Sequence, residues 1–397
     1  MVPQNVPLGL TFDDVLLLPG FSDFSRADIN LSTQLTKNIK LKTPFVSSPM
    51  DTVTESKLAI ALAQLGGMGI IHRNLSVANQ VKEVFNVKKE GLLVGAAIGI
   101  SKARLPAPEG SANGGQGYEE RVEALVKSGV DVIVVDSAHG YTKGVIDAIQ
   151  FIKKTYPHMQ VIGGNVATFD GARALINAGA EALRVGMGPG AICTTRIISG
   201  MGVPQITAIQ ETVRAAKNHS SSKQVPIIAD GGIKYSGDIV KAFAAGASVV
   251  MMGSFFAQTK ESPGKTVVLK KEQVPHRFQS VFNHSKLTYT FKEYRGMGSA
   301  AAMQKGVKVK SEDEFHGKNY KDRVLVAEGV EGLVPVKGTV KELVDQAIGG
   351  IKSGMYYVGA KTIPELWEKA QFIQITPASL TESHPHSVII TNPGENY

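Results

Sequence analysis

The sequence contains one cysteine among 397 residues, which excludes an internal disulfide and a metal site built from several cysteines. No apolar run reaches the ~18 residues that a membrane span needs, and we expect no signal peptide in residues 1–18. Aromatic residues make up only 7%, and the basic residues are scattered rather than gathered into one patch. These features argue against nucleic-acid binding and predict a globular chain in a reducing compartment, the cytoplasm.

Glycine is the residue in excess, with 42 of 397 positions against about 7% in average proteins. Glycine suits tight turns and places where the backbone approaches a ligand closely. The net charge of +8 suits a small anionic substrate. Together these features favour an enzyme that holds an anionic ligand with backbone groups.

Residues 45–254 repeat one pattern: a short apolar run, a cluster of Gly, Asp, Ser or Asn, and a stretch with helical spacing. The apolar runs are continuous rather than alternating, as in parallel strands that are buried on both faces. Eight such units favour a TIM (β/α)8 barrel as the single domain of residues 1–397, with an open doubly wound sheet as the alternative. The runs are 45–48, 68–71, 92–99, 130–136, 160–165, 181–186, 225–230 and 248–253.

Other stretches do not follow this repeat. Residues 103–117 form a loop rich in Pro and Gly, and residues 258–336 are predicted to leave the barrel after its eighth strand as a mobile flap. Residues 340–355 have the spacing of the eighth helix, and 356–397 are interpreted as a tail. Within the tail, 381–386 form a turn rich in hydrogen-bond acceptors, which is either a site or a solvated end.

Two glycine turns follow the seventh and eighth predicted strands. They are formed by Asp230, Gly231 and Gly232 and by Gly253 and Ser254. Phosphate often binds in barrels at the loops after strands seven and eight, where glycine leaves backbone N–H groups accessible. The pair therefore predicts a phosphorylated ligand, and Asp230 is placed to accept hydrogen bonds from a sugar diol.

The loop after the sixth strand carries the only cysteine. Cys193 lies among glycines and threonines, a poor setting for a small buried core residue, and Arg196 is close enough in sequence to favour the thiolate. We therefore predict that Cys193 is a nucleophile. Because no second cysteine exists for redox cycling, covalent attack on an electrophilic carbon is the expected chemistry.

Polar residues also end the fourth and fifth strands. Asp136 and Ser137 follow one of them and Asn165 follows the other, so they are placed to hold a second ligand across the mouth of the barrel. His72 and His139 also follow strands, and a hydrogen-bonded loop histidine is as good an interpretation of each as a catalytic one.

The ordered motifs resemble the inosine-5′-monophosphate dehydrogenase family over nearly the whole chain. The family also carries a pair of regulatory CBS modules after the second helix, and here the sequence continues directly through residues 90–93, so those modules are expected to be absent. The motifs are LTFDDVLLLP, LKTPFVSSPMDTVTES, GGMGIIHRN, VGAAIG, VDSAHG, GNVAT, RVGMGPGAICTTR, GMGVPQITAI, IADGGIKYSGDI, GASVVMMGS, YRGMGSAAAM, AEGVEG and ESHPH.

This resemblance implies a reaction in two stages. Cys193 attacks C2 of the hypoxanthine of IMP, hydride passes to NAD⁺, and water then hydrolyses the covalent adduct to xanthosine monophosphate. Thr195 matches the family's threonine that handles water, and a monovalent cation, normally potassium, binds beside the loop. The family is a tetramer of barrels, in which a neighbouring subunit completes the cation site.

The resemblance also assigns the binding residues. The nucleotide-binding positions are Ser48, Met50, Asp230, Gly231, Gly232, Gly253, Ser254, Tyr294, Gly296, Met297, Gly298 and Glu328. The cofactor-side positions are Asp136, Ser137, Asn165, Gly186 and Gly188. The potassium ligands are Gly188, Gly190 and Cys193, with Glu382, Ser383 and His384 of a neighbouring subunit.

Two departures from the family pattern bear on function. Ala191 stands where the family usually has a serine that touches phosphate. The adjacent Arg-Tyr pair of the flap, whose arginine serves as base for water, is missing, and Tyr320 and Arg323 are the nearest candidates to replace it.

That gap leaves two alternatives open. GMP reductase shares the barrel and the Cys-Thr-Thr loop and needs no water-activating arginine, but its pattern has a glutamate where this chain has Ala300. The other alternative is a nucleotide-binding protein with weakened catalysis. The tail and the segment VPQITAI favour the dehydrogenase.

Overall fold

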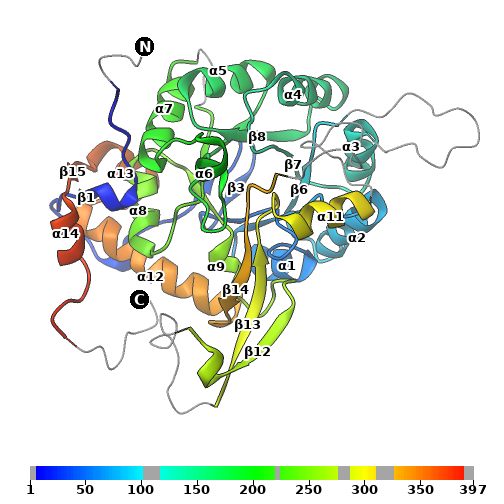
Figure 1. Ribbon diagram of the computed structural model, residues 1–397. Coiled ribbons are helices and arrows are strands. Elements are labelled where there is room, and N and C mark those ends of the chain that lie inside the picture. Colours follow the sequence, from blue (N-terminus) through cyan, green and yellow to red (C-terminus); the bar gives the residue numbers. More distant parts are fainter. Residues whose placement is uncertain (1–5, 102–116, 220–223, 276–286, 310–325, 389–397) are drawn as a thin grey trace, which may run out of the picture.

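The computed structural model describes residues 6–101, 117–219, 224–275, 287–309 and 326–388. Eight parallel strands form a closed barrel, in the order β10-β11-β4-β5-β6-β7-β8-β9 (Figure 1). This closure confirms the predicted TIM barrel and excludes the open sheet. The strands are β4 (Phe45–Ser47), β5 (Met68–Ile71), β6 (Val94–Ile98), β7 (Val132–Asp136), β8 (Gln160–Val166), β9 (Ala182–Val185), β10 (Ile227–Asp230) and β11 (Val249–Met252).

A long helix follows each barrel strand in the described part of the chain and packs outside the barrel. The fifth helix shows why these segments fold as they do: the Thr168 hydroxyl accepts from the Gly171 N–H at its start, and Gly179 ends it with a φ of 107°. The helices are α1 (Ser56–Gln64), α2 (Val77–Lys88), α3 (Tyr118–Lys127), α4 (Lys143–Thr155), α5 (Phe169–Ala178), α7 (Gln205–Lys217), α8 (Ser236–Ala244) and α12 (Val340–Val358).

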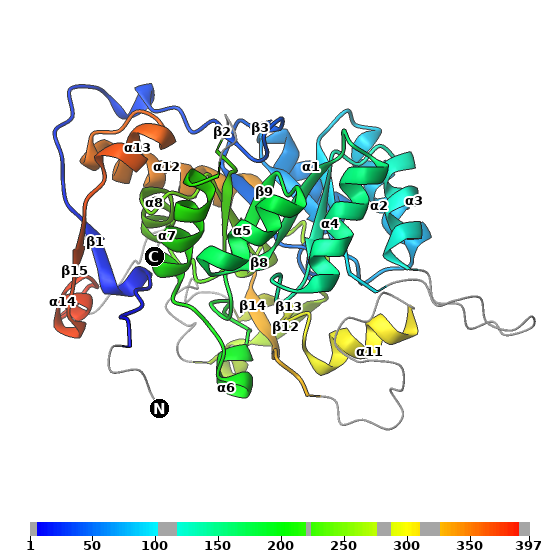
Figure 2. The ribbon, with the colours of Figure 1, turned by 90° about the horizontal axis from the view of Figure 1, so that it is seen from above.

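A short hairpin closes the N-terminal end of the barrel. It consists of β2 (Thr33–Gln34) and β3 (Lys40–Leu41). Leu35, directly after β2, and Leu41, in β3, belong to the apolar cluster inside the barrel. Figure 2 shows this hairpin at one end of the barrel and α6 (Thr195–Ser199), β13 (Thr288–Arg295), β14 (Glu331–Pro335) and α11 (Ala300–Lys308) at the other. The site therefore has to form at the open, C-terminal end.

The segment between β11 and α12 carries its own elements, which the sequence analysis did not predict. After α9 (Ser254–Ala257) come β12 (Thr266–Lys270), the 3₁₀ turn Lys271–Gln273, β13 (Thr288–Arg295), α11 (Ala300–Lys308) and β14 (Glu331–Pro335). The three strands pair antiparallel in the order β12-β13-β14. Residues 276–286 and 310–325 lie outside the described part, so the mobility expected for this segment stays a prediction.

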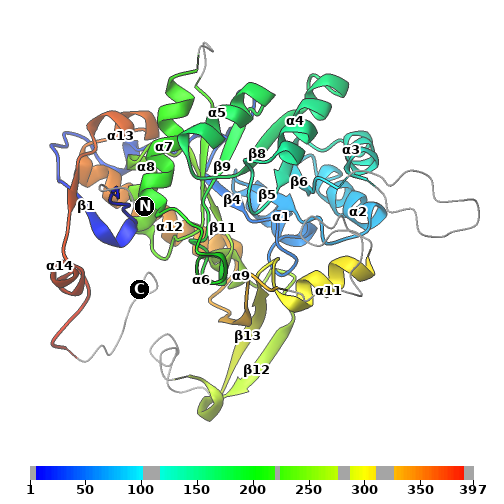
Figure 3. The same cartoon turned by 45° about the horizontal axis from the view of Figure 1, so that its top comes forward.

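The chain after α12 is not a mere tail, and that expectation was wrong. It contains α13 (Ile363–Lys369), β15 (Phe372–Gln374) and α14 (Pro377–Glu382), and β15 pairs antiparallel with β1 (Val15–Leu17) near the other end of the chain. Two 3₁₀ turns, Phe12–Asp14 and Arg26–Asp28, flank β1. Figure 3 shows β1, α13 and α14 on the side of the barrel near α8, with α11 on the opposite side near α2.

Two expectations concern segments with little or no described structure. Residues 102–116 of the Pro/Gly loop lie outside the described part. Residues 89–93 join α2 to β6 directly, and whether this reflects missing CBS modules stays a prediction. No helix in the described ranges is both long and apolar enough to cross a membrane.

Candidate active site

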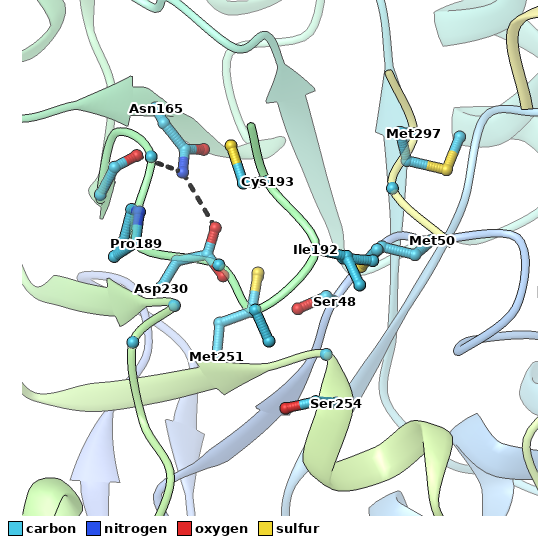
Figure 4. A pocket seen from close by; sticks show the side chains of 18 of the residues that line it. Ser48, Met50, Asn165, Pro189, Ile192, Cys193, Asp230, Met251, Ser254 and Met297 are labelled. Atoms are coloured by element: carbon cyan, nitrogen blue, oxygen red, sulfur yellow. Dashed lines mark hydrogen bonds between the residues drawn. The ribbon is translucent and has the colours of Figure 1, made fainter. Parts of the chain in front are cut away.

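A cavity of about 640 Å³ opens at the C-terminal end of the barrel. It is lined by the ends of β4, β7, β8, β10 and β11, by the loop 186–196, and by the inserted segment. Figure 4 shows Cys193, Asn165 and Asp230 directed toward a common space. The lining includes, from the sequence-predicted set, Ser48, Met50, Asp136, Ser137, Asn165, Gly186, Gly188, Gly190, Cys193, Thr195, Asp230, Gly231, Gly232, Gly253, Ser254, Tyr294, Gly296, Met297, Gly298 and Glu328.

The half-buried Cys193 begins a chain of hydrogen bonds. Its Sγ lies 3.2 Å from the Thr195 hydroxyl and is oriented to donate to it, and that hydroxyl donates to Oε2 of Glu328 over 2.8 Å. The Thr194 N–H also donates to the Glu328 carbonyl, at 3.0 Å. A proton that leaves the thiol, or a water in its place, therefore has a direct route to a carboxylate.

Arg196 contacts two backbone carbonyl groups, and its expected effect on the Cys193 thiolate stays a prediction. Its Nη2 donates to the carbonyl oxygen of Val203 at 2.8 Å, and its Nε and Nη2 donate to that of Met187 at 3.4 Å. A Cβ on Gly188 would lie 2.9 Å from the Arg196 Nε. Arg196 thus connects the two ends of the segment 187–203, which contains Cys193. This packing requires glycine at position 188.

A buried guanidinium joins two carboxylates that line the cavity. Arg184, on β9, donates through Nε to Oδ2 of Asp230 at 2.8 Å and through Nη1 to Oδ1 of Asp136. Burial opposes its charge, but Asp230 and Asp136 outweigh that effect and raise the pKa of Arg184. Asn165 also donates to Oδ2 of Asp230, at 2.9 Å, so the orientation of this carboxylate is fixed from two directions.

A recess suited to an anion lies at the end of β11. A Cβ on Gly253 would lie 2.7 Å from the Tyr294 hydroxyl and 3.6 Å from the Ser48 hydroxyl, so both polar groups border the space that glycine leaves. Burial raises the pKa of Tyr294 far above its ordinary value, and nearby Asp230 and Cys193 raise it further. Its hydroxyl therefore stays protonated and remains a hydrogen-bond donor.

The glycine turn after β10 completes this side. Gly231 and Gly232 have φ values of 91° and 81°, in the left-handed region that favours glycine. A Cβ on Gly231 would lie 3.0 Å from Cγ of Pro189, in the loop that contains Cys193. The glycine turn and this loop therefore pack closely only because Gly231 has no side chain.

Comparisons with known proteins agree with this geometry. A model of the IMP dehydrogenase / GMP reductase domain matches residues 9–386. The chain belongs to this family.

Three relatives align over nearly their whole length. The inosine-5′-monophosphate dehydrogenase of Aquifex aeolicus is 40% identical over 510 residues, which cover 100% of this chain and 99% of the relative. The enzyme of that name from Borreliella burgdorferi is 42% identical over 429 residues, covering 96% and 97%, and that of Escherichia coli K12 is 39% identical over 501 residues, covering 98% of each.

Five residues expected from the family pattern are not among the described residues that line the cavity. Tyr320 and Arg323 lie outside the described residues. Glu382, Ser383 and His384 are described but do not line the cavity of their own chain, and the ring of His384 lies 6.1 Å from that of Tyr235. The role of these five residues stays a prediction.

The two histidines of uncertain role are also outside the lining set. The side chain of His72 is fully buried, with Nε2 3.4 Å from Oε1 of Glu55. The backbone of His139 exchanges hydrogen bonds with the Ser137 hydroxyl. Both arrangements fit the structural interpretation of these histidines.

The cavity also contains residues that the sequence analysis did not select. Arg184 lies inside β9, and a single charged residue in an apolar run does not indicate toward which side of the strand its side chain points. Arg73 contacts Asp136 at 3.5 Å, and Lys234 pairs with Asp13 at 2.6 Å at the edge of the cavity. The lining further includes four methionines that were not selected, at positions 187, 251, 252 and 303, beside the expected Met50 and Met297.

Proposed function

We propose that this chain is an NAD-dependent IMP dehydrogenase, which oxidises inosine 5′-monophosphate to xanthosine 5′-monophosphate through a covalent bond to Cys193. The observation that carries the proposal is the hydrogen-bonded series Cys193–Thr195–Glu328, which faces a cavity with an anion recess. Full-length relatives that bear this enzyme name support it.

The nucleotide would lie across the C-terminal ends of β10 and β11. Its phosphate would accept hydrogen bonds from the Tyr294 and Ser48 hydroxyls and from backbone N–H groups of the glycine turns. The Oδ1 of Asp230 would accept from the ribose diol, because its Oδ2 already accepts from Arg184 and Asn165. Ala191 supplies no hydroxyl, so the phosphate depends more on Tyr294 and Ser48.

In the first stage the Cys193 sulfur bonds to C2 of the purine and the thiol proton moves along Thr195 toward Glu328. Asn165, Gly186 and Gly188 would hold NAD⁺, which would supply the acceptor for the hydride of C2. In the second stage, once Glu328 has released the thiol proton to solvent, water would attack the same carbon. One water proton would pass through Thr195 to Glu328 and return to the sulfur as the C2–S bond breaks, and the other would pass to the ring nitrogen N3. This route supplies the base that the missing Arg-Tyr pair would have provided.

The cofactor side of the cavity fits a nicotinamide. Oδ1 of Asn165 is buried and has no hydrogen-bond partner among the described residues, so it is available to a ligand amide. Gly186 and Gly188 leave the facing wall without side chains. Asp136 and Ser137 would hold the remainder of the cofactor.

We further propose a potassium site, a tetramer and a cytoplasmic location. The carbonyl groups of Gly188, Gly190 and Cys193 are neutral oxygen donors on one tight loop, the donor type that a monovalent cation accepts. Glu382, Ser383 and His384 would complete the site from a neighbouring subunit. The single cysteine supports a reducing compartment.

The deciding experiment follows nicotinamide absorbance in two reactions: IMP with NAD⁺ and potassium, and GMP with NADPH. We expect sustained NAD⁺ reduction in the first and none in the second. Oxidation of NADPH by GMP alone would instead identify a reductase. Tight IMP binding with neither reaction would identify a protein with weakened catalysis.

Two variants test the roles of individual residues. Cys193→Ala should abolish turnover while it leaves IMP binding nearly intact, and retained turnover would rule out Cys193 as the nucleophile.

Glu328→Gln should slow hydrolysis about a hundredfold or more, so that the covalent nucleotide adduct accumulates and is seen by mass spectrometry of the intact protein. An unchanged hydrolysis rate would exclude Glu328 as the base.

A further inference from the structure

The nucleotide site is built from two parts of the chain that are distant in sequence. Ser48 and Met50 belong to the turn that follows β4, in the barrel. Tyr294 and the segment 296–298 belong to the end of β13, in the inserted sheet. A nucleotide held between them needs a fixed spacing between barrel and insertion.

One buried carboxylate lies where these two parts meet. Asp51, whose side chain is fully buried, accepts a hydrogen bond at Oδ1 from Nε of Arg295 at 3.1 Å, and its Oδ2 accepts from Nη2 of the same residue. Nδ2 of Asn74 donates to Oδ2 at 3.0 Å, and Nζ of Lys305 lies 3.4 Å from it. Asp51 therefore joins four elements: the β4 turn, the loop after β5, the end of β13, and α11.

Two more hydrogen bonds connect the same elements. The backbone N–H of Arg295 donates to the Thr52 hydroxyl at 3.3 Å. Nδ2 of Asn74 also donates to the carbonyl oxygen of Ala302, on α11, at 3.1 Å. The carboxylate is thus the centre of a small polar network, and not one isolated ion pair.

We propose that Asp51 is a positioning residue that sets the distance between the barrel half and the inserted half of the nucleotide site. This inference rests on the proposed function. Asp51 follows Met50 directly, and Arg295 stands between Tyr294 and Gly296, so each partner of the pair adjoins residues that line the cavity. A bidentate arginine–carboxylate pair has a fixed geometry, which an apolar contact lacks.

Asp51 and Arg295 act on the nucleotide only through their neighbours, because neither lines the cavity. The network should therefore affect nucleotide affinity without changing the intrinsic reactivity of Cys193. A small displacement of binding groups is enough to weaken a bound substrate strongly. A purely structural role would instead lower stability and leave the affinity of the folded protein unchanged.

The test compares Asp51→Asn and Arg295→Lys with the full unmodified chain. We expect each to raise the KM and Kd for IMP about tenfold, while the rate of Cys193 alkylation by iodoacetamide without nucleotide stays within about twofold. Because both act through one contact, the double variant should be no worse than the worse single variant.

The matched control is Asp131→Asn, at the other end of the barrel. Asp131 precedes β7 and pairs with Nζ of Lys88 at 2.9 Å, with both side chains partly buried. Its loss should lower the melting temperature and leave the KM for IMP unchanged. This comparison separates a loss of stability from a loss of positioning.

The outcomes distinguish the two proposals. If the unmodified chain oxidises IMP but Asp51→Asn and Arg295→Lys keep its KM and Kd within about twofold, the positioning role is wrong and the enzyme function stands. Additive effects in the double variant would also overturn it. If Asp51→Asn does not fold, Arg295→Lys and Lys305→Met decide. If the unmodified chain neither binds nor oxidises IMP, both proposals fail.

Discussion

One residue, Arg184, pairs with two carboxylates that line the cavity. Arg184 lies between Asp136 on the cofactor side and Asp230 on the nucleotide side, and all three side chains are largely buried. Without the guanidinium, two carboxylates would share a region of low dielectric and repel each other. Under the proposed function, the same arginine would therefore support the nucleotide side and the cofactor side at once.

Replacement of Arg184 tests this shared support. Arg184→Gln should raise the KM for IMP and for NAD⁺ together, by about tenfold or more, because both carboxylates lose their orientation. Steady-state kinetics with each substrate varied in turn would measure both KM values. Arg173→Gln, which removes an exposed pair with Asp170 at 3.1 Å, is the control and should change neither. A rise in only one KM would contradict the shared role.

A second residue-scale prediction concerns the phosphate. Tyr294→Phe should weaken IMP binding roughly tenfold to a hundredfold, because a hydrogen bond to a charged group is lost. Inosine, which lacks the phosphate, should bind both proteins equally in titration calorimetry. Because the pKa of Tyr294 is raised, IMP affinity should show no loss that follows ordinary tyrosine ionisation near pH ~10. An equal loss of inosine affinity would contradict the assignment.

Among the elements, the inserted segment has buried polar contacts both with the barrel and within itself. Asp51 and Thr52 of the barrel contact Arg295 at the end of β13. Within the insertion, Lys292 on β13 is almost fully buried, and its Nζ donates to the Lys260 carbonyl at 3.0 Å and to the Ser262 hydroxyl at 3.1 Å, which ties β13 to the chain between α9 and β12. Because hydrogen bonds to charged groups have defined geometry, these contacts favour one position of the sheet.

The contribution of the Asp51–Arg295 pair to the free energy of unfolding should depend on pH. Burial alone would raise the pKa of Asp51, but the hydrogen bond and charge of Arg295, together with Lys305, lower it below its ordinary value of about 3.9. Its ionised form therefore stabilises the fold above that value, and the stabilisation is lost as the pH falls through the lowered pKa.

Urea unfolding of the unmodified chain and Asp51→Asn would measure this effect. The difference in unfolding free energy between them should be the same at pH 6 and pH 8 and should narrow below about pH 4. A difference that widens on acidification would mean that the carboxyl group is protonated in the native protein.

The sequence predicted the barrel strands well and the insertion poorly, for a physical reason. Most barrel-strand residues are buried on both faces and apolar, whereas β12 alternates exposed and half-buried residues. Its pairing partner is also distant, since Thr266 lies opposite Lys292. The same distance kept β15 from being predicted, because it pairs with β1 across most of the chain.

The candidate site likewise contains residues that the sequence indicated and residues that it did not. Cys193 and the glycine turns were found because they directly follow apolar runs, where a barrel places its ligands. Arg184 was missed inside a strand. Asp51 was missed because its partner Arg295 is 244 positions away, and a lone aspartate after a strand carries no sign of that pairing.

On the scale of the whole molecule, two segments that lie near opposite ends of the sequence pair beside the barrel. Strand β15 pairs with β1, and the described C-terminal residues continue through α14 to 388. The proposed cation site needs Glu382, Ser383 and His384 from another subunit. Activity would then depend on assembly.

Mixed assemblies test that dependence. Glu382→Ala should require about tenfold more potassium for half-maximal activity, while light scattering shows an unchanged mass. Coexpression with inactive Cys193→Ala chains should restore part of the response, because an intact Glu382 from one chain then meets an intact Cys193 from another. No recovery in assemblies proven to be mixed would place the glutamate's role within its own chain.

The methionines around the cavity have a practical consequence. Six of the eleven methionines in the sequence line this one space, from both the barrel and the insertion. Isotope labelling of their ε-methyl groups would give a sparse NMR spectrum in which about half the signals come from the ligand site. Binding of nucleotide and of cofactor, and the order in which they arrive, would be visible in solution without a chromophore or a chemical tag.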